Sequence, residues 1–129
     1  MKIVVHLTSS EGEQVLHSAF LAIGMATALK GMGADVTLML DSEAPNLVKK
    51  SWAGKMLAPM PGHKADKMPP RKLGGVIEKY IKSGGKILMC PHCSAVCGAS
   101  MDAIVPGAKH AEEGGLARLV FDADKIVDY

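Results

Sequence analysis

The sequence predicts one α/β domain over residues 1–129, built as three layers: an open, mostly parallel sheet of about five strands with helices on both faces. Two observations lead to this prediction. Apolar runs rich in β-branched residues alternate along the chain with segments of helical periodicity. Apolar residues make up 48% of the chain but aromatic residues only 4%, which suits an aliphatic core between helices and a buried sheet.

The first 40 residues predict a complete β–α–β unit. The continuous apolar run 2–7 is typical of a strand buried on both faces, and the run 35–40 is a second one. Between them, residues 13–32 predict a long amphipathic helix that glycines end. Its apolar positions recur at helical spacing: Val15, Leu16, Ala19, Phe20, Ile23, Ala26 and Leu29. Because a helix of crossover length joins them, the two strands should be parallel.

The middle of the chain is less regular. Turn residues open the segment 41–51, which continues as a short predicted helix. Residues 52–71 hold four prolines and show no periodicity, so they predict either a lid or binding loop near the cysteines, or a plain surface excursion or subunit contact. Residues 72–83 then predict a helix that the glycine pair at 84–85 ends.

The last third predicts a cysteine-bearing strand, a short helix over 94–101, a final helix and a closing strand. The segment 102–113 is ambiguous, since Ile104-Val105 and residues 108–111 could each belong to a short strand. Leu116, Leu119 and Val120 predict the final helix, and residues 124–129 the last strand.

Composition excludes several classes of function. A formal net charge of +2 without a basic cluster does not indicate direct binding of nucleic acid. No apolar run reaches membrane-spanning length and no signal-peptide pattern opens the chain, so we expect a cytoplasmic protein. We expect the nine methionines to serve mainly as core filler.

The three cysteines, Cys90, Cys93 and Cys97, form the strongest chemical signal. In a cytoplasmic protein such close spacing favours redox or metal chemistry over structural disulfides. Cys90 ends a predicted strand just before a helix, where unpaired N–H groups stabilise a thiolate, and His92 could assist.

Other predicted strand ends should meet Cys90 at the carboxyl edge of the sheet. They bring Thr8, Ser9, Ser10 and Asp41 to that edge, with His110 a further candidate. The hydroxyls at 8–10 could contact a small anionic ligand. Capping of the first helix by Ser9 or Ser10 is the stronger interpretation.

The cysteines also allow three other interpretations. The run Cys90-Pro91-His92-Cys93 matches the motif of strongly oxidising thioredoxin-fold enzymes, but here two β–α units precede it, which argues against that fold. The thiols with His92, His63 or His110 could form a zinc site, although Pro91 and the helix restrict their convergence, and we expect no metal or other cofactor. Cys93 and Cys97 could also be small core residues, the favoured reading for Cys97.

The chain resembles the DsrE/DsrF-like family, which includes sulfur-relay proteins of tRNA thiolation and of dissimilatory sulfur metabolism. The resemblance rests on the opening KIVVHLTSSEGE, the long Ala-rich helix ending in GMGADV, the strand GGKILMC and the terminal ADKIV. It covers nearly the whole chain and implies a flavodoxin- or Rossmann-like fold.

The resemblance also implies a role for two cysteines. In sulfur-relay members, a cysteine just after the third strand accepts a persulfide and passes it on, and Cys90 falls at that position. Some relatives carry a second cysteine three residues later, as Cys93 does. Relatives often have an arginine before the next glycine, whereas this chain has Val96-Cys97-Gly98. The resemblance further implies a homotrimer, or a homohexamer of two trimers, with protein partners as sulfur donor and acceptor.

The leading hypothesis is therefore a cysteine-based sulfur carrier or sulfurtransferase with Cys90 as acceptor thiolate and Cys93 as resolving thiol. The second hypothesis is a thiol–disulfide oxidoreductase or redox sensor that uses the same pair. The third is a non-enzymatic subunit that binds a small molecule or a partner.

Overall fold

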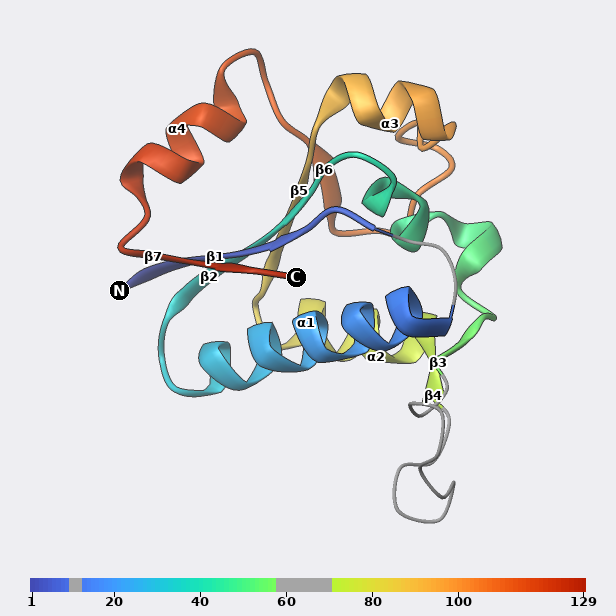
Figure 1. Ribbon diagram of the computed structural model, residues 1–129, viewed down its shortest axis with the longest axis horizontal. Helices are drawn as coiled ribbons and strands as arrows, with labels where there is room; N and C mark the ends of the chain where they lie inside the picture. The colour runs from blue at the N-terminus through green and yellow to red at the C-terminus, as the bar shows by residue number, and fades with distance from the viewer. Residues whose placement is uncertain (10–12, 58–70) are drawn as a thin grey trace.

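The computed structural model of the protein describes residues 1–9, 13–57 and 71–129. Its main sheet has five strands, all parallel, which confirms the predicted fold class (Figure 1). Their spatial order is β6 (Ala108–His110), β5 (Lys86–Met89), β2 (Asp35–Leu40), β1 (Lys2–Leu7) and β7 (Lys125–Asp128). Since the strands are parallel, their carboxyl ends meet at one edge.

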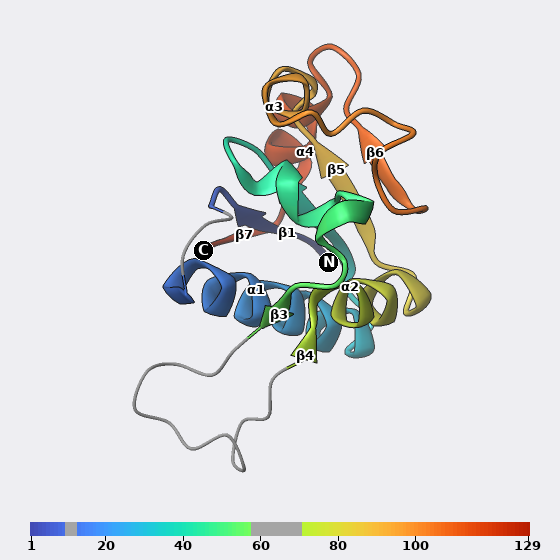
Figure 2. The same ribbon diagram turned by 90° about the vertical axis from the view of Figure 1, so that its right-hand side faces the viewer.

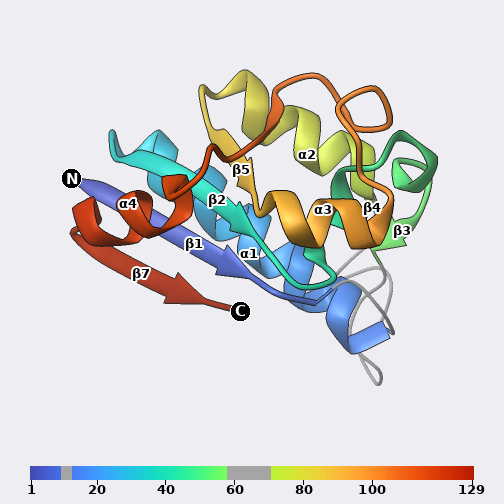
Figure 3. The same ribbon diagram turned by 90° about the horizontal axis from the view of Figure 1, so that it is seen from above.

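Helices cover both faces of this sheet. α1 (Glu13–Gly31) and α2 (Leu73–Lys82) pack on one face, and α3 (Pro91–Cys97) and α4 (Gly115–Asp122) lie on the other (Figures 1 and 3). The main core lies under α1 and α2. Alternate strand residues supply it, among them Ile3, Val5, Leu7, Val36, Leu38, Leu40, Ile87 and Met89. The intervening residues, such as His6 in β1, therefore point to the side of α3 and α4.

Tyr80 anchors α2 to the sheet. Its side chain is fully buried, and its hydroxyl donates hydrogen bonds of 2.7 Å to the carbonyl of Lys86 and 3.2 Å to that of Val36. The ring packs against Gly85, where any Cβ would overlap it. A glycine is thus required at the turn that leads into the cysteine strand.

The segment after β2 forms two 3-10 helices, η1 (Ala44–Val48) and η2 (Lys50–Trp52), in place of the single short helix that the sequence predicts. A two-stranded antiparallel ribbon of β3 (Met56–Leu57) and β4 (Arg71–Lys72) follows and lies beside α1 and α2 (Figure 2). The sequence pattern missed this ribbon. Residues 58–70, most of the proline-rich stretch, lie outside the described residues.

Two further expectations need correction. α3 begins at Pro91, three residues before the predicted helix, because proline fits the first helical position, where its missing N–H is not needed. Methionine is not mainly core filler in the part of the chain that the structure describes. Met39 and Met89 are buried there, but five other methionines are exposed: Met1, Met25, Met32, Met56 and Met101.

The ambiguous segment also has a clear structure. Residues 108–110 are the edge strand β6, whereas Ile104 makes an isolated bridge with Lys49. Among the described helices, none is long and apolar enough to cross a membrane.

Candidate functional site: a thiol cluster at the carboxyl edge

Backbone hydrogen bonds join the strand ends into one edge. The N–H of Cys90 donates to the carbonyl of Leu40 at 3.0 Å, and the N–H of Asp41 donates to that of Leu7 at 3.3 Å. The N–H of Glu43 donates to the carbonyl of Thr8 at 3.1 Å. The ends of β1, β2 and β5 therefore hold the loop 41–43 beside the cysteine segment.

Cys90 is the N-cap of α3. Its backbone is extended (φ −64°, ψ 121°), and its Sγ accepts the N–H of Cys93 at 3.5 Å. The Cys90 side chain is partly exposed. A sulfur in this position accepts one of the free N–H groups at the start of the helix and remains accessible to a reactant.

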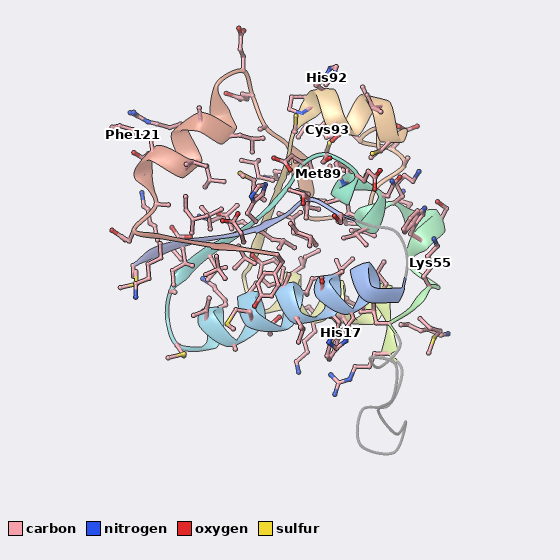
Figure 4. The ribbon with its side chains drawn as sticks, in the orientation of Figure 1. His17, Lys55, Met89, His92, Cys93 and Phe121 are labelled. Carbon is pink, nitrogen blue, oxygen red and sulfur yellow. The ribbon has the colours of Figure 1, made fainter. Side chains whose placement is uncertain are left out.

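Cys93 faces inward, toward the sheet edge (Figure 4). Burial raises the pKa of its thiol, and so does the hydrogen bond between this thiol and Cys90, while the N–H of Ser42 lowers it. The nearby charge of Asp41 acts in the raising direction. Cys93 therefore holds its proton more firmly than an ordinary cysteine and shares a hydrogen bond with Cys90.

Cys97, the last residue of α3, lies against the same loop. Its Sγ donates to the carbonyl of Ser42 at 3.5 Å, and Lys49 Nζ donates to the carbonyl of Cys97 at 2.8 Å. Burial raises the pKa of this thiol, with Lys49 opposing the shift. A lysine at a helix C-terminus stabilises the free carbonyls, so this contact fixes the end of α3.

Ser42 contacts two of the three cysteines through its backbone alone. Its N–H faces Cys93 and its carbonyl faces Cys97. Its φ of 55° lies in the left-handed region, which residues other than glycine seldom adopt. Such a conformation at a cluster of thiols marks Ser42 as part of the site.

The structure separates the other predicted site residues. Thr8 adjoins the loop 41–43 through its carbonyl, Ser9 is half-buried just after it, and Ser10 lies outside the described residues. His92 is exposed on the side of α3 away from the sheet, opposite Cys93 (Figure 4). His110 is tied to the carbonyl of Ala99 by a contact of 2.7 Å from Nε2.

Sequence reasoning missed a histidine beside this site. In β1, His6 Nδ1 lies 2.7 Å from Asp128 Oδ1, and Nε2 lies 3.0 Å from Asp41 Oδ2. The second contact is an ion pair by its distance, and among the described residues Nε2 has no hydrogen-bond partner. Burial lowers the pKa of His6, yet the contacts to both carboxylates outweigh it and leave the pKa raised above 6.5. The available signal was one polar residue in an otherwise apolar strand.

The described cysteines and histidines do not form a metal centre. Within residues 1–9, 13–57 and 71–129, no three His, Cys, Asp or Glu side chains are grouped to hold an ion. His63, one ligand considered for a zinc site, lies outside these ranges.

Comparison with solved structures supports the fold. The chain is similar to the crystal structure of the YchN protein from E. coli, with a TM-score of 0.73 and 21% identity over 99% of this chain and 98% of YchN. It is also similar to MTH1491, a protein of unknown function from Methanobacterium thermoautotrophicum, with a TM-score of 0.68 and 13% identity over 99% and 98% of the two chains. At these identities the likeness shows the fold.

Comparison with the curated proteins gives no match. The model of the DsrE/DsrF-like family, however, matches residues 1–129, the whole length given. This chain belongs to the DsrE/DsrF-like family.

Proposed function

We propose that the protein is a cysteine-based persulfide carrier in which Cys90 accepts and passes on sulfur. Membership in the DsrE/DsrF-like family supports a sulfur-relay role in general terms. One observation carries the finer proposal: the partly exposed Cys90 sulfur accepts the N–H of Cys93 and shares a hydrogen bond with its thiol. Cys93 therefore keeps its proton, and Cys90 is the accessible sulfur that accepts an N–H.

The transfer step needs a thiolate and a donor persulfide. Cys90 as thiolate attacks the outer sulfur of the donor R–S–SH, the S–S bond breaks, and the donor leaves as R–S⁻ with the bonding electron pair. The product is Cys90–S–SH. An acceptor thiolate then attacks the outer sulfur of this persulfide and restores the Cys90 thiolate. We infer that donor and acceptor are proteins.

Cys93 has two possible roles in this scheme. Because its pKa is raised, it stays protonated near neutral pH and can donate its S–H to the charged sulfur on Cys90. Once deprotonated, it can instead attack the Cys90 Sγ, which forms a Cys90–Cys93 disulfide and releases hydrosulfide. A dithiol reductant must then reopen that disulfide.

Mass spectrometry after incubation with a small persulfide donor tests the proposal. We expect a mass gain of about 32 Da, one sulfur atom, assigned to Cys90 by fragment spectra. Cys90→Ser should abolish the gain, and Cys97→Ser should retain it. Sulfur on Cys97, or none on any cysteine, would contradict the proposal.

A thiol–disulfide oxidoreductase or redox sensor is the second candidate, because the contact between Cys90 and Cys93 also suits a disulfide. In that case the oxidised protein loses about 2 Da and never gains sulfur. Reactive cysteines with neither product would favour a non-enzymatic binding subunit.

A further inference from the structure

The His6 ring is held between two carboxylates from different segments. Asp128 comes from β7, and Asp41 from the loop that follows β2. An imidazolium donates a hydrogen bond to Asp128 while its positive charge pairs with the Asp41 carboxylate, whereas a neutral imidazole offers Asp41 no charge. The side chain is 21% exposed, which limits screening by water. The charged form of the ring therefore fits this position best.

Other charged groups near β1 lie at a different place. α4 packs over the amino end of the strand, where Arg118 and Asp122 line a cavity together with Lys2 and Asp35. α1 packs on the opposite face of the sheet. Among the residues that the structure describes, the titratable groups that face His6 are Asp41 and Asp128, and Cys93 of α3 lies beyond Asp41.

Asp41 links the ring to the thiols. Its carboxylate contacts His6 at 3.0 Å, and its negative charge acts on Cys93. The residue before it, Leu40, accepts the N–H of Cys90, and the residue after it, Ser42, faces Cys93 and Cys97. An uncompensated carboxylate here would oppose a thiolate or a persulfide anion.

We propose that His6 is a positioning residue of the thiol site: as an imidazolium between Asp128 and Asp41, it holds the Asp41 carboxylate and compensates its charge, so that an anionic sulfur can form beside it. This inference rests on the proposed function for its biological meaning. The effect of His6 on the reactivity of Cys90 and Cys93, however, can be measured without any sulfur donor.

The effect of His6 on the thiols should depend on pH. While His6 is protonated, Asp41 is compensated, so the thiols lose a proton and react more easily than they would without the imidazolium. When the pH rises above the pKa of His6, the ring loses its charge and the wild-type protein comes to resemble a variant without the imidazole. A His6→Gln substitution should therefore slow the thiols most at low pH and least at high pH.

The test is the rate of iodoacetamide alkylation of Cys90 and Cys93 between pH 5.5 and 9, with fragment spectra to assign each residue. For His6→Gln we expect a rate about threefold to tenfold lower than wild type at pH 6, with the difference vanishing at high pH. Asp41→Asn should react at least as fast as wild type, and His6→Gln should have no further effect in that background.

Two more variants sharpen the result. Asp122→Asn removes one carboxylate at the far end of β1 and should leave alkylation unchanged. Asp128→Asn keeps the His6 ring but weakens its hold on the proton. The pH above which the imidazolium no longer promotes alkylation of the thiols should therefore be lower than in wild type. This variant also serves as the test if His6→Gln does not fold, which circular dichroism would reveal.

Two outcomes would overturn the inference: a His6→Gln effect that is the same at every pH, or one that persists fully in the Asp41→Asn background. Either would mean that His6 only supports the packing of β1. Failure of the wild-type protein to take up sulfur would contradict the proposed function alone, because the alkylation comparison does not depend on it.

Discussion

The hydroxyl of Ser94 donates a hydrogen bond of 2.7 Å to the carbonyl of Cys90, and Ser94 is fully buried. The same carbonyl accepts the N–H of Ser94 at 2.9 Å in the first turn of α3. A serine inside a helix often bonds back to the carbonyl four residues earlier, and here that carbonyl belongs to the candidate nucleophile. Ser94 thus holds the backbone carbonyl of Cys90 in place through its buried side chain.

Replacing this serine should weaken the start of α3. We expect Ser94→Ala to lower the free energy of unfolding by about 1 kcal/mol, since a buried hydrogen bond is lost. Urea denaturation measures the change. Ser100→Ala is the control, because its hydroxyl is exposed and bonds to the exposed Asp102, so the change should stay within about 0.5 kcal/mol. Equal stability of Ser94→Ala and wild type would contradict the role assigned to this contact.

The glycine at position 85 is predicted to be required. A Cβ there would overlap the ring of Tyr80, which is buried and held by its hydroxyl, so neither group can move freely. We expect Gly85→Ala to destabilise the protein by about 1–3 kcal/mol in thermal or urea unfolding. Gly75→Ala in α2 is the matched control: it meets nothing within 4 Å and should stabilise the helix by up to about 1 kcal/mol.

His6 should make stability depend on pH. Its pKa is raised in the folded protein, so its contribution is complete below the unfolded value of about 6.5 and is lost as the pH rises through the folded value. Wild type should therefore be more stable at pH 5.5 than at pH 8, by about 1 kcal/mol or less because the site is partly solvated. The thiols with raised pKa act in the same direction only at higher pH.

Urea denaturation of His6→Gln at the same two pH values checks this assignment. The variant should lose most of the difference between pH 5.5 and pH 8. A variant that keeps the full difference would place its origin in another group.

The sequence predicted the sheet because its strands are continuous apolar runs that the local pattern alone can identify. It also predicted the meeting of Thr8, Asp41 and Cys90, because parallel strands place their carboxyl ends at one edge. The other features of the site depend on tertiary contacts, which a local sequence pattern does not reveal. The positive φ of Ser42 is one example, because a serine in the sequence gives no sign of it.

Tertiary context explains what the sequence pattern could not show. The strand 2–7 is confirmed, but His6 within it has partners, Asp41 and Asp128, that are 35 and 122 residues away in the chain, a distance that no local pattern spans. Leu57 lies in the stretch 52–71, which shows no periodicity, but it joins the main core through β3. The exposed methionines were misread because composition does not say which apolar residues the core can accommodate.

Those exposed side chains lead to the last prediction, that the protein is a homo-oligomer. A cavity of about 470 Å³ lies between the end of α1 and the strands β1 and β7. Apart from Lys125 its lining is apolar and includes Met1, Met25, Leu29 and Met32. Met32 is 82% exposed, and Phe121 on α4 is 81% exposed. Exposed apolar patches of this kind usually mark contacts between proteins.

Light scattering at micromolar concentration should give three or six times the 13.6 kDa of one chain, as the family resemblance implies. Met32→Lys should lower that mass if subunits meet at this cavity, because a buried lysine without a partner is strongly unfavourable. Met101→Lys, at an exposed methionine that does not line the cavity, is the matched control and should leave the mass unchanged. A mass of one chain for wild type would refute oligomerisation, and a mass of two would keep the contact but contradict the trimeric arrangement.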